Sequence, residues 1–222
     1  MSAITISRQY GSGGRKVALR VSEILGWSLF DKRLMMNVAR DLGLSKDDIV
    51  DFTEDDYKVT SFWDRLFRYG GFSDPTGAHH MIMTNEAINA FTTAEMDEDA
   101  AVRLVNKAIQ MAHARGNVVI VGRGGQALLQ DKRDVFHVRV QAPMAMRKQR
   151  LVAYEEIDQD EAESIAIQRD EAGKKYMKRF FDVAWDDPEL YHMVINSEKL
   201  DIEAIAQIIV TTAKQVLAVK EA

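Results

Sequence analysis

The stretch ISRQYGSGGRKVALRVSEILG, residues 6–26, decides how the rest of the chain is interpreted. It starts inside Ala3–Ser7, a short β-branched run that is typical of a buried strand. Three glycines in four residues follow, and Arg15–Leu25 then places apolar side chains at helical spacing until Gly26. A strand, a glycine-rich turn and a helix present several backbone amides at a helix N-terminus, and this geometry favours a bound anion such as phosphate.

Three interpretations of the glycine turn are open. It could be a tight turn without a ligand, because glycines also serve such turns. It could be a dinucleotide site of the G-x-G-x-x-G type, with Asp31 as the ribose-binding acid, although Lys16 stands at the third glycine. We favour the third interpretation, a variant phosphate loop with Ser12 inside it.

This loop departs from the Walker pattern G-x-x-x-x-G-K-[ST]. When the second glycine of the pattern is aligned with Gly13, Arg8 stands at the first glycine and Gly14 at the lysine. The usual lysine and the usual Mg²⁺-binding hydroxyl are therefore missing. Arg15 or Lys16 would have to supply the charge that the lysine normally brings to the phosphates.

Further along the chain, strand patterns alternate with helix patterns. The expected strands are 27–30, 117–121, 135–140 and 191–196, and the expected helices are 32–42, 98–115, 143–152, 161–181 and 202–219. This alternation predicts an α/β fold with a parallel sheet covered on both faces. Ligands of such sheets bind at the carboxyl ends of the strands, where the glycine loop, Asp31 and the turn Gly122–Gly125 would meet. Residues 51–95 interrupt the alternation and predict a helical insertion.

Composition excludes several classes of protein. The 222 residues are 46% hydrophobic and 28% charged, which is ordinary for one soluble globular domain. A formal charge of −5 gives no global field that would attract a nucleic acid polymer or an anionic membrane. The chain has no cysteine, its histidines show no metal-ligand spacing, and it shows no signal peptide or membrane-spanning run. We therefore expect a cytoplasmic protein without a membrane association or a metal site of its own.

Four segments carry a resemblance to a known family. The segment ITISRQYGSGGRKVALRVSEILGWSLFDKRLM resembles the opening of the cytidylate kinase-like family, whose members are relatives of bacterial cytidylate kinase among the P-loop nucleoside monophosphate kinases. VVIVGRGGQALL resembles the strand and G-R-D turn with which cytidylate kinases place an arginine on the acceptor nucleotide. IAIQRDEAGKKYMKRF resembles their arginine-rich lid, and DPELYHMVINSEKLDIEAIAQII resembles their last strand and helix.

The resemblance implies a fold and an activity. The fold is a P-loop NTPase-type three-layer sandwich of residues 1–222, with a five-stranded parallel sheet, an insertion at 51–95 beside the acceptor site and a lid-like segment at 155–182. The activity is transfer of the γ-phosphoryl group of ATP, with Mg²⁺, to a (d)CMP-like pyrimidine monophosphate. A homo-oligomer is compatible with this fold. The alternative is a non-catalytic nucleotide-binding protein of the same fold with a degenerate P-loop.

The resemblance also implies roles for particular residues. Asp31 and Arg123 would bind the acceptor, and Arg169 would be a lid arginine that meets the transferring group. The donor phosphates would be held by Gly11, Ser12, Gly13, Gly14, Arg15 and Lys16. Two departures stand out, because Gly14 replaces the Walker lysine and Gly124 stands where cytidylate kinases carry the aspartate of G-R-D.

The helix pattern at 161–181 carries a basic run with two interpretations. The run comprises Arg169, Lys174, Lys175, Lys178 and Arg179. It could neutralise the phosphoryl group in transfer, which needs positive charge around the equatorial oxygens. It could equally be a solvated helical face whose charges pair with neighbouring acids.

Overall fold

The computed structural model describes residues 2–31 and 98–218. The helix expected at 32–42 and the insertion expected at 51–95 lie outside these described residues.

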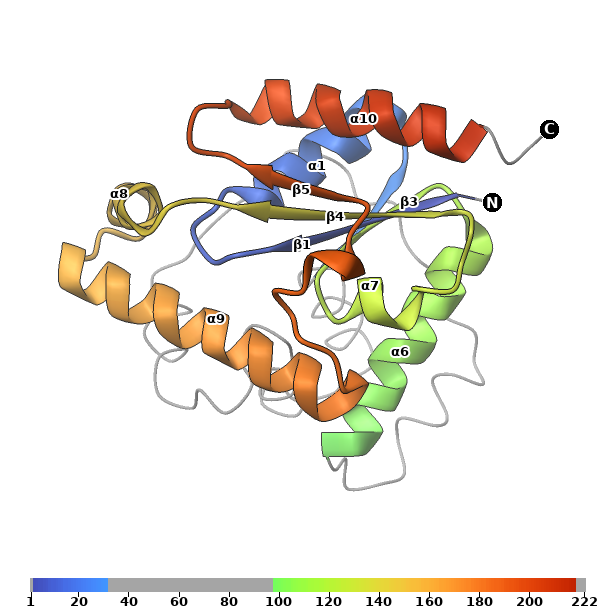
Figure 1. The fold of residues 1–222 in the computed structure, drawn as a ribbon, viewed down its shortest axis with the longest axis horizontal. Helices are drawn as coiled ribbons and strands as arrows, with labels where there is room; N and C mark the ends of the chain where they lie inside the picture. Colours follow the sequence, from blue (N-terminus) through green and yellow to red (C-terminus); the bar gives the residue numbers. More distant parts are fainter. Residues whose placement is uncertain (1, 32–97, 219–222) are drawn as a thin grey trace, which may run out of the picture.

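A five-stranded parallel sheet forms the centre of the fold (Figure 1). Its strands stand in the order β2-β3-β1-β4-β5, and every pairing is parallel. The strands are β1 (Ala3–Arg8), β2 (Ser28–Phe30), β3 (Val118–Val121), β4 (Val135–Gln141) and β5 (Met193–Asn196). Because all strands run the same way, their carboxyl ends share one edge, as the alternating pattern predicted.

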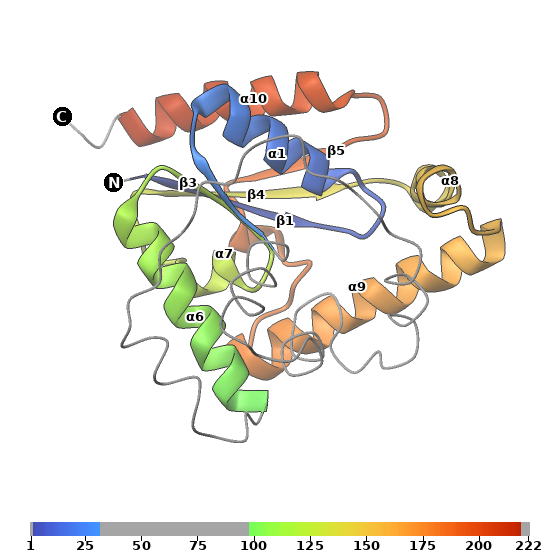
Figure 2. The ribbon, with the colours of Figure 1, turned by 180° about the vertical axis from the view of Figure 1, so that it is seen from behind.

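Helices cover both faces of the sheet. Helices α1 and α10 lie on one face and α6, α7 and α9 on the other, while α8 lies beyond the edge to which the strand arrows point (Figures 1 and 2). Their bounds are α1 (Gly14–Leu25), α6 (Glu98–Arg115), α7 (Gly125–Leu128), α8 (Met144–Glu155), α9 (Gln159–Phe181) and α10 (Ile202–Ala218), with a 3-10 turn η1 (Pro188–Leu190) before β5. The three-layer α/β fold is confirmed. The short α7 follows the turn Gly122–Gly125, where only a turn was expected.

The two faces of the sheet differ in polarity, because side chains of a strand alternate between faces. Ile4, Ile6, Val138 and Val140 pack with α1 and α10 in the larger apolar cluster. The intervening positions of β1 and β4 are Thr5, Ser7, His137 and Arg139, all of them buried polar side chains. The face toward α7 and α9 is therefore polar as it approaches the carboxyl edge.

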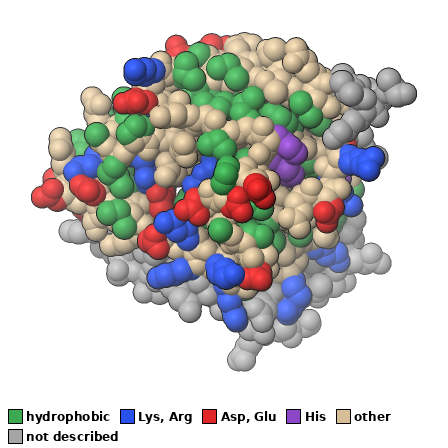
Figure 3. Space-filling view, viewed as in Figure 1, with side chains coloured by type: hydrophobic (Ala, Val, Ile, Leu, Met, Phe, Trp, Pro, Cys, Tyr) green, Lys and Arg blue, Asp and Glu red, His purple; other side chains and the backbone are tan. Residues whose placement is uncertain are grey.

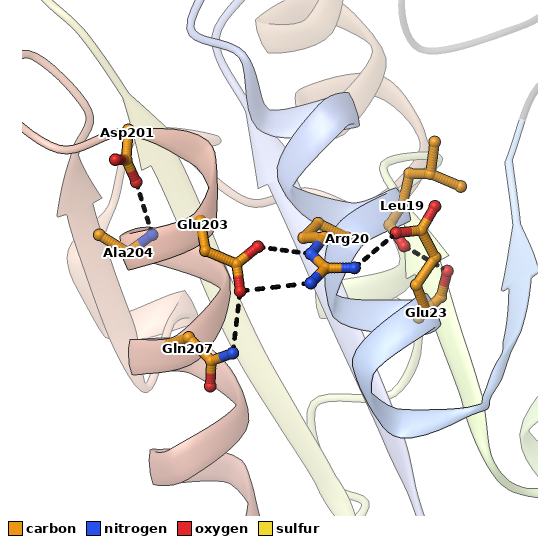
Figure 4. Close-up of polar contacts among 8 residues, drawn as sticks. Leu19, Arg20, Glu23, Asp201, Glu203, Ala204 and Gln207 are labelled. Carbon is orange, nitrogen blue, oxygen red and sulfur yellow. Dashed lines mark hydrogen bonds and ion pairs between the residues drawn. The ribbon is translucent and has the colours of Figure 1, made fainter.

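Helices α1 and α10 are joined across their outer surface by an ion pair. Figure 4 shows Arg20 of α1 between two carboxylates, Glu203 of α10 and Glu23 of its own helix. These contacts raise the pKa of Arg20 further above its usual range, so the side chain stays charged. The pair is exposed and therefore contributes little to stability compared with the core beneath it. None of the helices within residues 2–31 and 98–218 has the length and apolar character of a membrane span.

Two adjacent residues of α10 give a test of this packing. Ile209 is fully buried against the sheet, whereas Ile208 is 40% exposed on the same helix. We expect Ile209→Ala to lower the free energy of unfolding by about 2–5 kcal/mol, because it leaves a cavity in the core. Ile208→Ala should cost less than about 0.5 kcal/mol. Urea denaturation of both variants measures the difference, and equal costs would contradict the assignment of the buried face.

A pair of stacked histidines lies on the polar face of the sheet. His137 of β4 is 3% exposed, and its Nδ1 lies 2.7 Å from the hydroxyl of Thr5. The His192 ring stacks on it with 5.0 Å between ring centroids. Burial, and secondarily the proximity of His192, lowers the pKa of His137 from 6.5 to about 4. The folded protein therefore holds this imidazole in its neutral form.

The low pKa of His137 predicts a loss of stability in acid. The unfolded chain takes up a proton near pH 6.5, while the folded chain does so only near pH 4. This contribution is complete above pH 6.5, and about 3 kcal/mol should be lost as the pH falls to 4. Unfolding free energies of wild type and His137→Gln across this range should converge toward acid pH. An NMR titration that places the His137 pKa near 6.5 would contradict the prediction.

Candidate functional site

Three strand ends meet at the carboxyl edge and bring the expected site residues together. The glycine loop follows β1, Asp31 follows β2, and the turn Gly122–Gly125 follows β3. The backbone amide of Gly122 donates to the carbonyl of Ile6 at 3.0 Å, which joins the turn to the strand that carries the loop. The expectation that these three segments share one edge is confirmed.

The glycine loop leaves the start of α1 open to an anion. Gly11 and Gly13 have φ angles of 77° and 83°, in the left-handed region that favours glycine. Gly13 is the N-cap and offers no side-chain cap, and the first turn of α1 holds no acid. A helix start leaves its first amides without partners in the helix, so the amides of residues 14–16 can bind a phosphate oxygen.

The orientation of the loop backbone is fixed at Ser12. Its carbonyl oxygen accepts hydrogen bonds from Arg150 Nη1 at 2.9 Å and from the Ser197 hydroxyl at 2.7 Å. Since a trans peptide points its C=O and N–H in opposite directions, the Gly13 amide faces away from Arg150. The Ser12 hydroxyl is fully buried and has no hydrogen-bond partner among the described residues.

An ion pair between the buried Arg147 and the largely buried Asp170 holds the loop against α8 and α9. Arg147 donates from Nε to the Tyr10 carbonyl at 2.6 Å, and its Nη2 lies 2.7 Å from the Asp170 carboxylate. Asp170 in turn accepts the Tyr10 amide at 3.0 Å. Burial raises the pKa of Asp170, and the charge of Arg147 opposes this shift. The Asp170 carboxylate thus binds the amide of Tyr10, and the Arg147 guanidinium binds its carbonyl.

Arg15 and Lys16, the two residues expected to replace the Walker lysine, have other contacts. Arg15 Nη2 lies 2.8 Å from the carboxylate of Asp31, whose side chain is 7% exposed. Lys16 Nζ lies 3.5 Å from the centroid of the Tyr154 ring on α8, and this ammonium lowers the pKa of the Tyr154 phenol. Arg15 is therefore directed toward the end of β2, the expected acceptor side.

Buried arginines concentrate around this edge. Arg123 is 3% exposed and has a φ of 59°, so the turn after β3 adopts a costly conformation to place it. Arg169 is equally buried, with its guanidinium 5.6 Å from the centroid of the Tyr10 ring. Among the described residues, the buried Asp, Glu, Lys and Arg side chains are Asp31, Arg123, Arg139, Arg147 and Arg169. The interior at this edge carries an excess of positive charge.

Arg139, which was not predicted as a site residue, links the edge to the segment after α9. Its Nη1 donates to the Trp185 carbonyl at 2.8 Å, and its guanidinium lies 4.3 Å from the centroid of that indole ring. The Trp185 indole N–H donates to the Ser7 hydroxyl at 3.0 Å. A charged residue within the apolar strand VFHVRVQ was the available signal, because such a position is buried in a parallel sheet.

Arg147, Arg150 and Ser197 were also missed. Ser197 directly follows β5, so the strand-end rule could have found it. The two arginines lie on α8, and their partners in the loop are about 137 residues away in the chain. Nothing local to α8 reveals such contacts.

The basic run of α9 divides into two parts. Arg169 faces the loop, as described above. Lys174 pairs with Glu171, and Lys178 pairs with Asp182, on the exposed side of the helix. Basic and acidic side chains are mixed over this face of the molecule (Figure 3). Lys174 and Lys178 thus belong to a solvated face on which they are paired with acids.

Comparison with known proteins identifies the family. The model of the cytidylate kinase-like family matches residues 3–199, and the chain belongs to this family. The chain is similar to a cytidylate kinase of Methanocaldococcus jannaschii, with 34% identity over 118 residues that cover 52% of this chain. The match spans 63% of that relative, which is less than two thirds of its length.

Solved structures share the fold. A protein of Eubacterium ventriosum superimposes with a TM-score of 0.65 at 20% identity, covering 96% of this chain and 99% of the other. Shikimate kinase from Acinetobacter baumannii, solved with shikimate, gives a TM-score of 0.50 at 15% identity and covers 100% and 96% of the two chains. These likenesses establish the P-loop kinase fold.

The packing around position 124 explains why a glycine stands where the resemblance led us to expect the aspartate of a G-R-D turn. A Cβ atom at this position would lie 2.2 Å from Cε2 of the Phe181 ring at the end of α9. The φ of Gly124 is 70°, which side chains rarely adopt. The ring of Phe181 and an aspartate at position 124 therefore exclude each other in this backbone.

Gly26 gives a matched control for this exclusion. Its φ is 65°, close to that of Gly124, but a Cβ there would meet nothing within 4 Å. Both Gly→Ala variants should lose about 1–2 kcal/mol to the left-handed conformation. Gly124→Ala should lose more in thermal or urea unfolding, because of the clash with Phe181. The double variant Gly124→Ala/Phe181→Ala should reduce this added loss, and equal costs for the two single variants would contradict the packing argument.

Proposed function

We propose that this protein is an ATP-dependent nucleoside monophosphate kinase that transfers a phosphoryl group to a (d)CMP-like pyrimidine nucleotide. The observation that carries the proposal is the group of four buried arginines around an open phosphate loop. Guanidinium groups favour phosphate because they are permanently charged and can bind two of its oxygens together. The phosphates of two nucleotides are the anions that a kinase of this family would bring to this edge.

The residues at the edge suit ATP with Mg²⁺. The open amides of the loop and the buried Ser12 hydroxyl provide donors for donor phosphates. The described residues contain no group of three His, Asp or Glu that could hold a metal ion alone. Mg²⁺ needs few protein ligands when substrate phosphates and waters supply the others, so it would be held mainly by the nucleotide. When bound, the ion would neutralise charge on the phosphates.

Arg150, Arg123 and Arg169 have distinct parts in the proposed reaction. The amides of the loop hold the donor, and the Arg150–Ser12–Ser197 contacts keep the Gly13 amide in place for it. Arg123, presented from the turn after β3, binds the acceptor phosphate. Arg169, from the lid-like segment, neutralises the transferring group, because phosphoryl transfer depends on positioning and charge rather than on a covalent nucleophile.

Arg15 and Asp31 connect the two substrates in this proposal. Asp31 accepts from Nε and Nη2 of Arg15, so one edge of the guanidinium is fixed. The Arg15 side chain is still 43% exposed, which allows a phosphate to approach it. Asp31 thus positions Arg15 between the donor loop and the acceptor side. The preference for a pyrimidine is supported by the cytidylate kinases among the relatives.

The alternative is a nucleotide-binding protein without turnover. It is favoured by Gly14, which leaves the loop without the ammonium that a Walker lysine places on the β- and γ-phosphates. The two functions share binding at the loop and differ in chemistry. Measurements of binding and of turnover on the same preparation distinguish them.

A coupled assay with ATP, Mg²⁺ and each nucleoside monophosphate tests the proposal. We expect turnover with CMP or dCMP, and Arg123→Met should lower kcat/KM by about 10²–10³-fold through loss of a phosphate contact. Arg133→Met is the control, because Arg133 is exposed before β4. ATP binding in calorimetry without turnover of any monophosphate would favour the alternative. An ATP-soaked crystal with an empty loop would contradict both functions.

A further inference from the structure

The first and last positions of the phosphate loop touch each other. A Cβ atom on Gly14 would lie 2.4 Å from Cβ and 3.1 Å from Cγ of Arg8, and 3.3 Å from Cβ of Val140. The Arg8 atoms lie close to its backbone, and Val140 is a buried strand residue. Neither residue can therefore move aside without a shift of the backbone. A side chain at position 14 and the arginine at position 8 are therefore mutually exclusive in this backbone.

Both positions also depart from the Walker pattern. Arg8 stands where the pattern has its first glycine, and Gly14 stands where it has its lysine. A lysine at position 14 requires a small residue at position 8, and an arginine at position 8 requires glycine at position 14. The sequence has thus exchanged a glycine and a basic residue between two positions in contact.

Three other cations near the loop, Arg15, Lys16 and Arg150, have contacts with the loop or with its neighbours. Arg15 is held by Asp31, and Lys16 lies over the Tyr154 ring. Arg150 donates to the carbonyls of Ser12 and Ser197 and to the Ser197 hydroxyl. These contacts help to fix the loop, and the case for Arg8 rests on its position against Gly14.

We propose that Arg8 is the substrate-contacting residue that replaces the Walker lysine and binds the donor phosphates. This inference rests on the proposed function. The first two carbons of the Arg8 side chain lie where a side chain at position 14 would begin, so Arg8 enters the same space from the opposite end of the loop. A guanidinium suits this role because it can bind two phosphate oxygens together.

Variants of the exchanged pair test the inference. Arg8→Met keeps the carbons that pack on Gly14 and removes the charge, and we expect it to weaken Mg²⁺-ATP binding in calorimetry by about 10- to 100-fold. Arg8→Lys should retain most of the affinity. The double variant Arg8→Gly/Gly14→Lys restores the Walker arrangement and should bind ATP within a few-fold of wild type. Arg20→Met, which removes an equal charge from the exposed side of α1, should leave binding unchanged.

The stability of each variant separates a structural role from phosphate binding. Gly14→Lys alone should lower the melting temperature, and Arg8→Gly in the double variant should recover it. If Arg8→Met binds ATP as wild type does, or if the double variant binds no better than Arg8→Met, the inference is wrong while the proposed function stands. If wild type binds no nucleotide at all, both are wrong.

Discussion

The ion pair between Arg147 and Asp170 is the interaction on which the site depends. It joins α8 to α9, and both partners also bond the Tyr10 backbone at the start of the phosphate loop. Removing one partner of such a pair would leave an uncompensated buried charge, which typically costs about 3–5 kcal/mol. The loop is thus held from outside by side chains, and its inner amides stay available to a ligand.

The polar face of the sheet explains how so much positive charge can be buried. Arg139 is stabilised by a carbonyl, an indole ring and the Tyr191 hydroxyl at 3.3 Å. Thr5, Ser7 and His137 continue this polar layer along β1 and β4. Arginine suits such an environment because its planar guanidinium is weakly hydrated and stacks on aromatic rings. The opposite face is apolar and carries the core that keeps α1 and α10 in place.

Gly14 departs from the Walker pattern and Gly124 departs from the G-R-D turn, and the two departures have the same physical cause. At position 124 the ring of Phe181 fills the space of a side chain, and at position 14 the stem of Arg8 does so. Both glycines are therefore parts of the packing around them. Phe181 also packs beside the aromatic cluster that includes Tyr176 and Trp185, so the end of α9 is anchored next to the turn that presents Arg123. At both positions, a side chain from elsewhere in the chain fills the space that a side chain at the glycine would need.

The sequence by itself determined the alternation of strands and helices along the chain, the class of the fold and the edge where the site lies. Hydrophobic periodicity and glycine stops are local signals, and they placed β1, α1 and Gly26 within a residue of their observed positions. The strand-end rule brought the loop, Asp31 and Arg123 together. Only the tertiary structure decided the partner of each charge: Asp31 for Arg15, Asp170 for Arg147, and the carbonyl of Ser12 for Arg150. All three pairings join residues of different elements and depend on side-chain directions that no local pattern encodes, because a pairing is fixed only when packing brings the two groups within a few ångströms.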